Sequence, residues 1–258
     1  MNSKKSGAGV QLLPLRGIGE VMPGDDLAAL LTACLQAHCV SAGDIVVIAQ
    51  KIVSKAENRY VDLAAVTPSA QALQLAEATG KDARLVELIL SQSKRVVRYR
   101  QNVLIVEHTL GFVHANAGID HSNIPRNNRS ERALLLPEDP DASAAQLQAR
   151  LSPGLGVNLG VIINDSAGRA WRNGVTGIAI GAAGMPCLLD LRGVHDRHGN
   201  PLRVTEVGIA DEIAAAASLV MGQAAQGIPA VLVKGLDLDG PANNASALIR
   251  DPVKDLFR

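Results

Sequence analysis

Aromatic side chains are what this sequence has least of. Only 2% of its 258 residues are Phe, Trp or Tyr, so a platform that stacks the bases of single-stranded nucleic acid is difficult to build. A basic net charge is also missing, because 25 Lys and Arg are balanced by 25 Asp and Glu. Duplex nucleic acid requires a positive field. The composition therefore indicates that nucleic acid is not a partner.

Cysteines are few, and long apolar runs are missing. Cys34, Cys39 and Cys187 are odd in number and form no C-x-x-C pair, which predicts reduced core thiols and neither a disulfide framework nor a zinc site. The longest apolar candidate, residues 213–221, is far shorter than the roughly 20 residues that span a bilayer. No apolar run typical of a secretory signal follows the first ten residues. We expect a cytoplasmic protein without a membrane partner.

Aliphatic residues are abundant. With 47% hydrophobic residues in 258, the chain can bury a substantial core without disulfides or a structural metal. Residues 1–10 are expected to form a disordered extension. Residues 11–258 are expected to form one functional domain with two lobes.

The pattern of apolar residues predicts helices and strands in mixed order. Helices are expected where apolar stripes follow acidic caps or a proline, over residues 27–38, 68–79, 82–90, 141–151 and 210–222. Strands are expected over residues 45–53, 103–108, 112–116, 160–163, 175–180 and 230–234. Hairpins mixed with α/β alternation favour an α+β fold with mixed sheets over a doubly wound parallel sheet.

A first polar cluster, residues 116–123, leaves the second strand of a predicted hairpin through a Gly-containing turn. It places the carboxylate of Asp120 and the carboxamide of Asn123 three residues apart. Polar loop residues held by a strand end are well placed for binding. The alternative is an Asp-Asn turn that satisfies its own backbone.

A second polar cluster, residues 164–174, follows the apolar strand that is expected to end at Ile163. Asp165 and the adjacent Ser166 are suited to a hard divalent ion, and Arg169 and Arg172 to the phosphates that such an ion bridges. The alternative is a capped turn in which Asp165 pairs with Arg169.

Two further segments are candidates for binding an anion. Lys51 and Lys55 arrive with the strand that begins at Ile45, and Lys55 can offer a point charge to a phosphate, although a strand-end lysine is often only solvated. The loop 221–229 is polar and bounded by glycines, so it can wrap a ligand with its backbone amides or simply end a helix. Neither G-x-x-x-x-G-K-[ST] nor G-x-G-x-x-G occurs.

In order, these segments resemble the F420-0:L-glutamate ligases, also called F420 gamma-glutamyl ligases. The resemblance runs from about residue 13 to about residue 235. It is carried by Pro23-Gly24-Asp25-Asp26-Leu27, Val53-Ser54-Lys55-Ala56-Glu57, Asn116-Ala117-Gly118-Ile119-Asp120 with Ser122-Asn123, Leu134-Leu135-Leu136-Pro137, Asp165-Ser166 with Gly168-Arg169 and Arg172-Asn173-Gly174, Ala179-Ile180-Gly181, Ala210-Asp211-Glu212-Ile213-Ala214, and Gly227-Ile228-Pro229-Ala230.

The resemblance implies a GTP-dependent amide ligase. Such an enzyme joins the amine of L-glutamate to the carboxylate of coenzyme F420-0, through an acyl phosphate, and can add further gamma-linked glutamates. Similar proteins have a two-lobed α+β fold, form homodimers, and use Mg²⁺ or Mn²⁺ with a stimulating monovalent cation such as K⁺. A second, flavin-binding domain that some relatives carry after the ligase region is not expected in this chain.

The resemblance also implies roles for individual residues. It makes Asp120, Asp165, Ser166 and Gln223 metal ligands, and Asp120, Asp165 and Arg172 the catalytic group. The nucleotide contacts that it implies are Ile18, Gly19, Glu20, Val21, Gln50, Lys51, Lys55, Asn123, Met221, Gly222, Gln223, Gly227 and Ile228.

Five residues depart from the family pattern. Ser166 replaces a common Thr but keeps the hydroxyl, and Asn58 replaces a common Gly but tolerates a left-handed backbone. Gln50-Lys51 and Gln223 differ from some relatives at guanine-binding and metal-binding positions. Two alternatives therefore stay open: a protein that binds GTP or a deazaflavin without turnover, and a ligase for a phosphoglyceryl acceptor.

Overall fold

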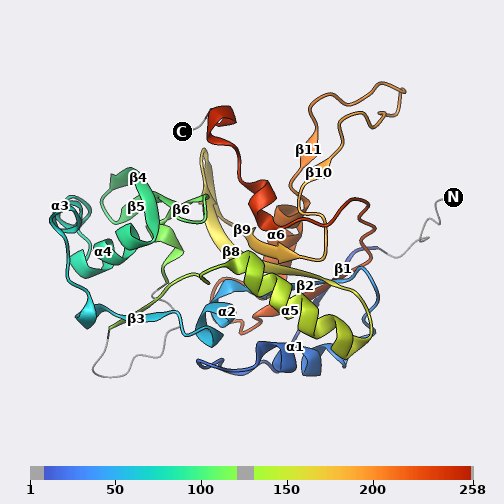
Figure 1. Cartoon of the computed structure of the whole chain (residues 1–258), viewed down its shortest axis with the longest axis horizontal. Helices are drawn as coiled ribbons and strands as arrows, with labels where there is room; N and C mark the ends of the chain where they lie inside the picture. The colour runs from blue at the N-terminus through green and yellow to red at the C-terminus, as the bar shows by residue number, and fades with distance from the viewer. Residues whose placement is uncertain (1–8, 121–130, 257–258) are drawn as a thin grey trace.

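A five-stranded mixed sheet forms the centre of the molecule. The computed structural model describes residues 9–120 and 131–256 (Figure 1). The sheet has the order β1-β12-β2-β8-β9, with β1 at Gln11–Pro14, β2 at Ile45–Ala49, β8 at Gly160–Arg169, β9 at Arg172–Ala183 and β12 at Ala230–Lys234. Only β2 and β8 pair in parallel among these neighbours. The predicted α+β class is confirmed.

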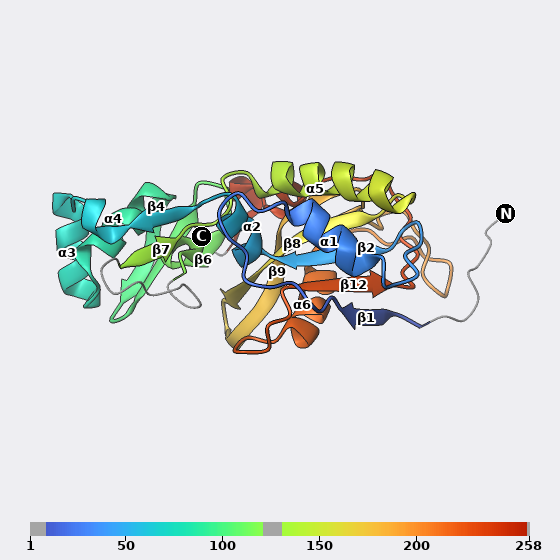
Figure 2. The ribbon, with the colours of Figure 1, turned by 90° about the horizontal axis from the view of Figure 1, so that it is seen from below.

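Helices cover both faces of the central sheet (Figure 2). Strand β2 is aliphatic and buried along almost its whole length, as expected for a strand covered on both sides. Leu31 of α1 (Leu27–Leu35) and Leu151 of α5 (Pro140–Leu155) share one core with Val46. On the other face, Ala214 of α6 (Ile209–Met221) packs in a core with Val47. Successive residues of β2 thus point alternately into one core and into the other.

A smaller lobe lies at the other end of the molecule. It contains α3 (Ala70–Thr79), α4 (Ala83–Ser91) and the antiparallel sheet β4-β5-β6 (Ser93–Arg100, Val103–His108, Val113–Ala115), which surround a core of their own. Figure 1 shows these elements together at the left. The pair β3 (Tyr60–Asp62) and β7 (Arg132–Leu134) runs between this lobe and the central sheet. The described chain therefore has two lobes, one around the central sheet and one around this smaller core.

Short elements complete the described chain. The 3-10 helices are η1 (Leu63–Ala65), η2 (Asn116–Gly118), η3 (Ala245–Leu248) and η4 (Pro252–Lys254), and the strands β10 (Leu189–Asp190) and β11 (Glu206–Val207) form a projecting hairpin. Within residues 9–120 and 131–256, no helix has the length and apolar character needed to cross a bilayer. The predicted extension, residues 1–10, falls mainly outside the described residues.

The expected helix starts hold at Asp26 and Asp82, but α3 begins at Ala70 and not at the expected Pro68, because Ser69 caps it. Asp26, Ser69 and Asp82 each accept a backbone N–H at the start of α1, α3 and α4, and Gly80 ends α3 in the left-handed conformation. Helix α1 stops at Leu35, so the expected end at residue 38 was wrong. The end was hard to predict because no glycine or proline follows the helix closely in the sequence.

Several sequence-based expectations were wrong. The strand expected over residues 45–53 ends at Ala49, and α2 (Gln50–Ala56) follows, because the buried Ile52 and Val53 fit a helix face as well as a strand. Strand β8 continues beyond Ile163 through the polar cluster, since that cluster pairs with β9. Strands β1 and β4 were not expected. Cys39 is exposed, so it is not a core thiol.

The buried His108 makes stability sensitive to acid. Burial, aided by the nearby charges of His114, Arg59 and Lys94, lowers the pKa of His108 to about 4. Its Nδ1 accepts the backbone N–H of Leu110 at 3.0 Å. The folded chain therefore resists a protonation that the unfolded chain accepts near its ordinary pKa of 6.5.

We expect the free energy of unfolding to fall between pH 6.5 and pH 4 by roughly 3 kcal/mol on account of His108 alone. Above this window the imidazole is neutral in both states and contributes no pH dependence. Urea unfolding across the window should show a shallower loss for His108→Gln than for the natural chain. Equal slopes for the two proteins would contradict the prediction.

Candidate active site

A cavity of about 530 Å³ opens at one edge of the central sheet. Strands β2 and β8 are parallel, so Ala49 at the carboxyl end of β2 lies beside Asn164, where the polar part of β8 begins. The carboxyl end of a parallel strand is a frequent place for ligand binding in α/β sheets. Four segments line the cavity, with Ile18, Gly19, Glu20, Val21, Ala49, Gln50, Lys51, Ile52, Lys55, Asn164, Asp165, Ser166, Ser218, Met221, Gly222, Gln223, Ala224, Ala225, Gly227, Ile228 and Pro229.

Helix α2 brings two lysines to this cavity. Lys51 and Lys55 are four residues apart and therefore lie on one face of the helix, while Ile52 and Val53 enter the core. Gln50, at the start of α2, is 2% exposed and its Oε1 accepts a hydrogen bond from Ser54 Oγ at 2.9 Å. Helix α2 thus packs one face into the core and places the ammonium groups of two lysines at the cavity.

Each lysine pairs with a carboxylate from a distant segment. Lys55 Nζ lies 2.5 Å from Glu20 Oε1, and the two side chains are 7% and 57% exposed. Lys51 Nζ lies 2.5 Å from Asp120 Oδ2. A buried ammonium whose carboxylate partner is largely solvated is well suited to exchange that partner for a ligand phosphate, since the solvated carboxylate loses little on release.

Strand β8 contributes Asn164, Asp165 and Ser166. Asp165 Oδ1 accepts the backbone N–H of Ser166 at 2.8 Å. Asn164 Oδ1 is buried and has no hydrogen-bond partner among the described residues. Asp165 Oδ2 is equally buried, and there it meets the imidazole of His114 at 3.3 Å. Buried acceptors without a hydrogen bond are costly. Carboxylate, amide and hydroxyl oxygens are the ligands that Mg²⁺ and Ca²⁺ prefer, so these residues fit a hard divalent cation.

His114 of β6 faces Asp165 from the smaller lobe. Its Nε2 lies 3.3 Å from Asp165 Oδ2, and the two side chains are 8% and 11% exposed. Burial acts to lower the pKa of His114, but the hydrogen bonding and charge of Asp165, with help from backbone groups of Ala115 and Ser166, outweigh burial and raise that pKa above its ordinary value.

Asp120 enters the region from the chain that follows η2. Its backbone N–H donates to the carbonyl of Leu134 at 2.9 Å, and the N–H of Leu134 donates back at 3.0 Å. The carboxylate does not line the cavity itself, but its partner Lys51 does. The small bridge to Leu134 therefore places the predicted metal ligand beside one wall of the cavity.

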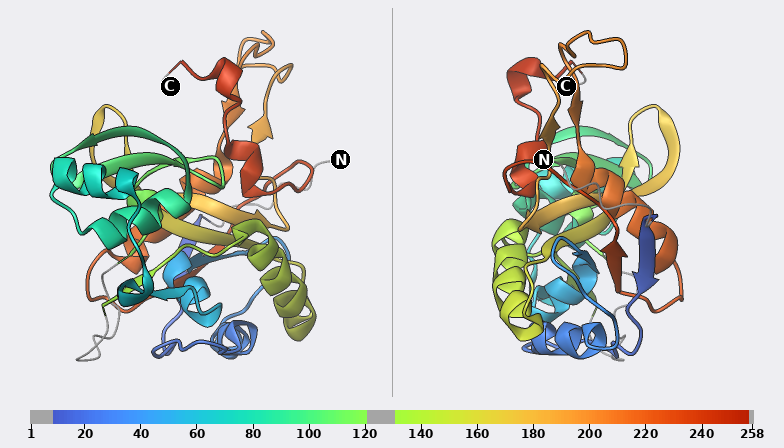
Figure 3. Two further views of the ribbon diagram at one scale, coloured as in Figure 1. Left: turned by 60° about the vertical axis from the view of Figure 1, so that its left-hand side comes forward. Right: turned by 90° about the vertical axis from the view of Figure 1, so that its right-hand side faces the viewer.

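Most of the predicted site residues meet in this cavity. The ones that line it are Ile18, Gly19, Glu20, Val21, Gln50, Lys51, Lys55, Asp165, Ser166, Met221, Gly222, Gln223, Gly227 and Ile228. Arg172 does not line it. Arg172 pairs with Arg169 at the exposed tip of the β8–β9 hairpin, which projects from the molecule in Figure 3. Asn123 lies outside the described residues.

Three residues of the region were not singled out from the sequence. Asn164 is 6% exposed, and its Nδ2 donates to Ser218 Oγ at 3.0 Å. An asparagine at the end of an aliphatic strand was a usable signal for it. Ser218 in an Ala-rich helix and His114 in a short hairpin strand gave no comparable signal, because their neighbours come from distant segments.

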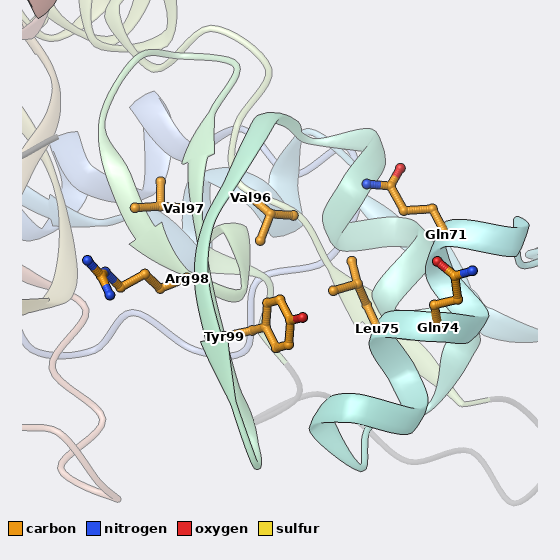
Figure 4. Close-up of a pocket in the computed structure, with 7 residues that line it drawn as sticks. All are labelled: Gln71, Gln74, Leu75, Val96, Val97, Arg98 and Tyr99. Atoms are coloured by element: carbon orange, nitrogen blue, oxygen red, sulfur yellow. The ribbon is translucent and has the colours of Figure 1, made fainter.

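A second cavity, of about 460 Å³, lies in the smaller lobe between α3 and β4. Gln71, Gln74, Leu75, Val96, Val97, Arg98 and Tyr99 line it. In Figure 4 the Tyr99 ring faces the side of α3 that carries Gln74 and Leu75. None of the predicted site residues lines this cavity.

The first cavity is typical of a site that binds an anionic, phosphorylated ligand with a cation. Residues 17–235 match the family model described as F420-0:Gamma-glutamyl ligase. The chain therefore belongs to the F420-0:gamma-glutamyl ligase family.

Relatives within this family align along nearly the whole chain. A protein of Methanopyrus kandleri named "Coenzyme F420:L-glutamate ligase" is 46% identical over 244 residues, covering 93% of this chain and 94% of the relative. A protein of the same name from Methanothermobacter thermautotrophicus is 43% identical, covering 97% and 99% of the two chains. One from Methanocaldococcus jannaschii is 40% identical, covering 88% and 90%.

The wall that holds Asn164 depends on a glycine of β9. A Cβ on Gly177 would lie 2.3 Å from Ser218 Oγ, 2.4 Å from the carbonyl of Ala214 and 2.7 Å from Asn164 Oδ1. We expect Gly177→Ala to lower the free energy of unfolding by about 1–3 kcal/mol, because α6 must move away from the sheet.

Gly168, in the partner strand β8, is the matched control. A Cβ there meets no atom within 4 Å, so Gly168→Ala should change stability by much less. Urea unfolding of the two variants measures the difference. A loss for Gly177→Ala no larger than that for Gly168→Ala would contradict close packing at this wall.

Proposed function

We propose that this chain is a GTP-dependent ligase that joins the amine of L-glutamate to the carboxylate of coenzyme F420-0, and adds further gamma-linked glutamates. Membership of the family and the names of its relatives support glutamate ligation in F420 biosynthesis. The observation that carries the proposal is the cavity itself, where two lysines of α2 and the buried Asp165 meet beside the carboxyl end of β2.

The nucleotide is proposed to lie along the lysines. Lys55 and Lys51 contact its phosphates, and the backbone of residues 18–21 and 221–228 surrounds the remainder. Gln50 is the proposed contact for the base. The enzyme acts as a homodimer in the cytoplasm, with K⁺ as a stimulating ion.

Asp120, Asp165, Ser166 and Gln223 are the residues that would hold Mg²⁺ or Mn²⁺. The buried acceptor Oδ2 of Asp165 fits this role. A divalent ion there supplies charge neutralisation for the phosphates of the nucleotide. Gln223 and Ser166 line the same cavity as Asp165, so they belong to one wall of the proposed site.

The chemistry must activate a carboxylate, which is a poor electrophile. The acceptor carboxylate oxygen takes the γ-phosphoryl group of GTP, giving an acyl phosphate and GDP. The glutamate nitrogen then attacks the acyl carbon, phosphate leaves, and the amine loses a proton. Phosphoryl transfer is catalysed by positioning and charge neutralisation, which the lysines of α2 provide.

The direct test combines the purified protein with F420-0, L-glutamate, GTP and Mn²⁺. We expect a product heavier by one glutamyl residue, together with GDP. A parallel reaction with the phosphoglyceryl acceptor separates the two acceptor variants. Thermal stabilisation by GTP without GDP release would support a binding protein instead, and the absence of product with authentic acceptors would overturn the ligase.

We expect Asp120→Asn and Asp165→Asn each to lower kcat/KM by about 100-fold or more, because each removes a negative charge that would hold the divalent cation against the phosphates. Initial rates of GDP release measure the effect, and circular dichroism checks the fold. Asp190→Asn, an exposed acid that pairs with Arg192 in the β10–β11 hairpin, is the control and should keep full activity. Activity retained in either site variant would remove that residue from the site.

A further inference from the structure

An imidazole of the smaller lobe contacts the candidate site. His114 lies on β6, in the sheet of the smaller lobe, and Asp165 lies on β8 of the central sheet. Their side chains meet with Nε2 and Oδ2 3.3 Å apart, and both are about nine-tenths buried. His114 does not line the cavity. It therefore acts on the site through the residues that it contacts, the Asp165 carboxylate and the backbone of Ser166.

The Asp165 carboxylate is contacted on both of its oxygens. Oδ1 accepts the N–H of Ser166 at 2.8 Å, and Oδ2 lies against the imidazole. Rotation about the Cβ–Cγ bond would lose both contacts at once. The orientation in which the carboxylate meets the cavity is thus set by one group on its own strand and one group from the other lobe.

The imidazole is held as firmly as the carboxylate. His114 Nδ1 lies 2.9 Å from the carbonyl oxygen of Ala115. The Phe112 ring packs edge-on to His114 with centroids 6.2 Å apart, and it stacks on His108 at 5.1 Å. The stacked rings of Phe112 and His108 therefore pack beside His114, so the imidazole has little freedom to swing out.

We propose that His114 is a positioning residue that fixes the Asp165 carboxylate in the orientation that binds the divalent cation. This proposal rests on the proposed function, in which Asp165 is a metal ligand. Removing a group that hydrogen-bonds to a metal ligand, without itself binding the metal, commonly weakens metal affinity 10- to 100-fold. His114 would thereby make cation binding depend on how the smaller lobe docks on the central sheet.

The test measures Mn²⁺ binding to the whole protein by electron paramagnetic resonance, with Mn²⁺ alone as the probe. We expect His114→Leu to weaken binding about 10-fold or more. His114→Gln should restore binding to within about 3-fold, because its amide nitrogen can reach the place of Nε2. In GDP-release assays, the apparent KM for Mn²⁺ should rise for His114→Leu while kcat at saturating Mn²⁺ changes much less.

His108→Gln is the matched control. It removes a ring that stacks on Phe112 and has no contact to Asp165, so its Mn²⁺ affinity should fall far less than that of His114→Leu. Wild-type affinity in His114→Leu would overturn the proposal. A loss of Mn²⁺ affinity that His114→Gln fails to restore would also overturn it, because it would indicate a packing effect. A nitrogen coupling to bound Mn²⁺ that His114→Leu abolishes would overturn it as well, because it would make His114 a direct ligand.

Asp165→Asn separates this proposal from the proposed function. If Asp165→Asn loses Mn²⁺ while His114→Leu keeps it, positioning by His114 is wrong and the metal role of Asp165 stands. If Asp165→Asn binds Mn²⁺ like the natural chain, the metal role itself is wrong, and positioning by His114 fails with it.

Discussion

The parallel pairing of β2 with β8 is the constraint on which the site depends. It sets Ala49, the last residue of β2, beside Asn164, the residue at which the polar part of β8 begins. Helix α2 begins directly after β2, and the polar part of β8 begins directly after its aliphatic part. Cationic and anionic side chains therefore reach one edge of the sheet, and a shift in register by one residue would send them to opposite faces.

The balanced charge of the chain hides an uneven distribution. At the cavity, Lys55 and Asp165 are both largely buried, and each meets a partner from a distant segment. Charges interact more strongly there than in water, because the surroundings are less polarisable. A neutral, aromatic-poor protein can thus hold anionic ligands with a few local cations. The few rings near the site, Phe112 and His108, support His114 and do not form a stacking platform.

Local signals explain which parts of the fold were predictable. Asp26, Asp82 and Gly80 marked helix ends because capping acts within one turn of the chain. The end of β2 was not predictable, since Ile52 and Val53 are buried whether the chain continues as a strand or turns into a helix. The polar half of β8 escaped prediction because pairing with β9, and no local preference, makes it a strand.

The sequence by itself determined the order of the motifs, and hence the family, together with most residues that line the cavity. Those residues are recognisable because they sit in short segments of fixed chemistry. Only the tertiary structure decided that His114 meets Asp165, that Lys51 meets Asp120, and that Arg172 lies away from the cavity at a hairpin tip. Sheet register and the docking of two lobes set these contacts, and neither can be predicted from the neighbouring residues in the sequence.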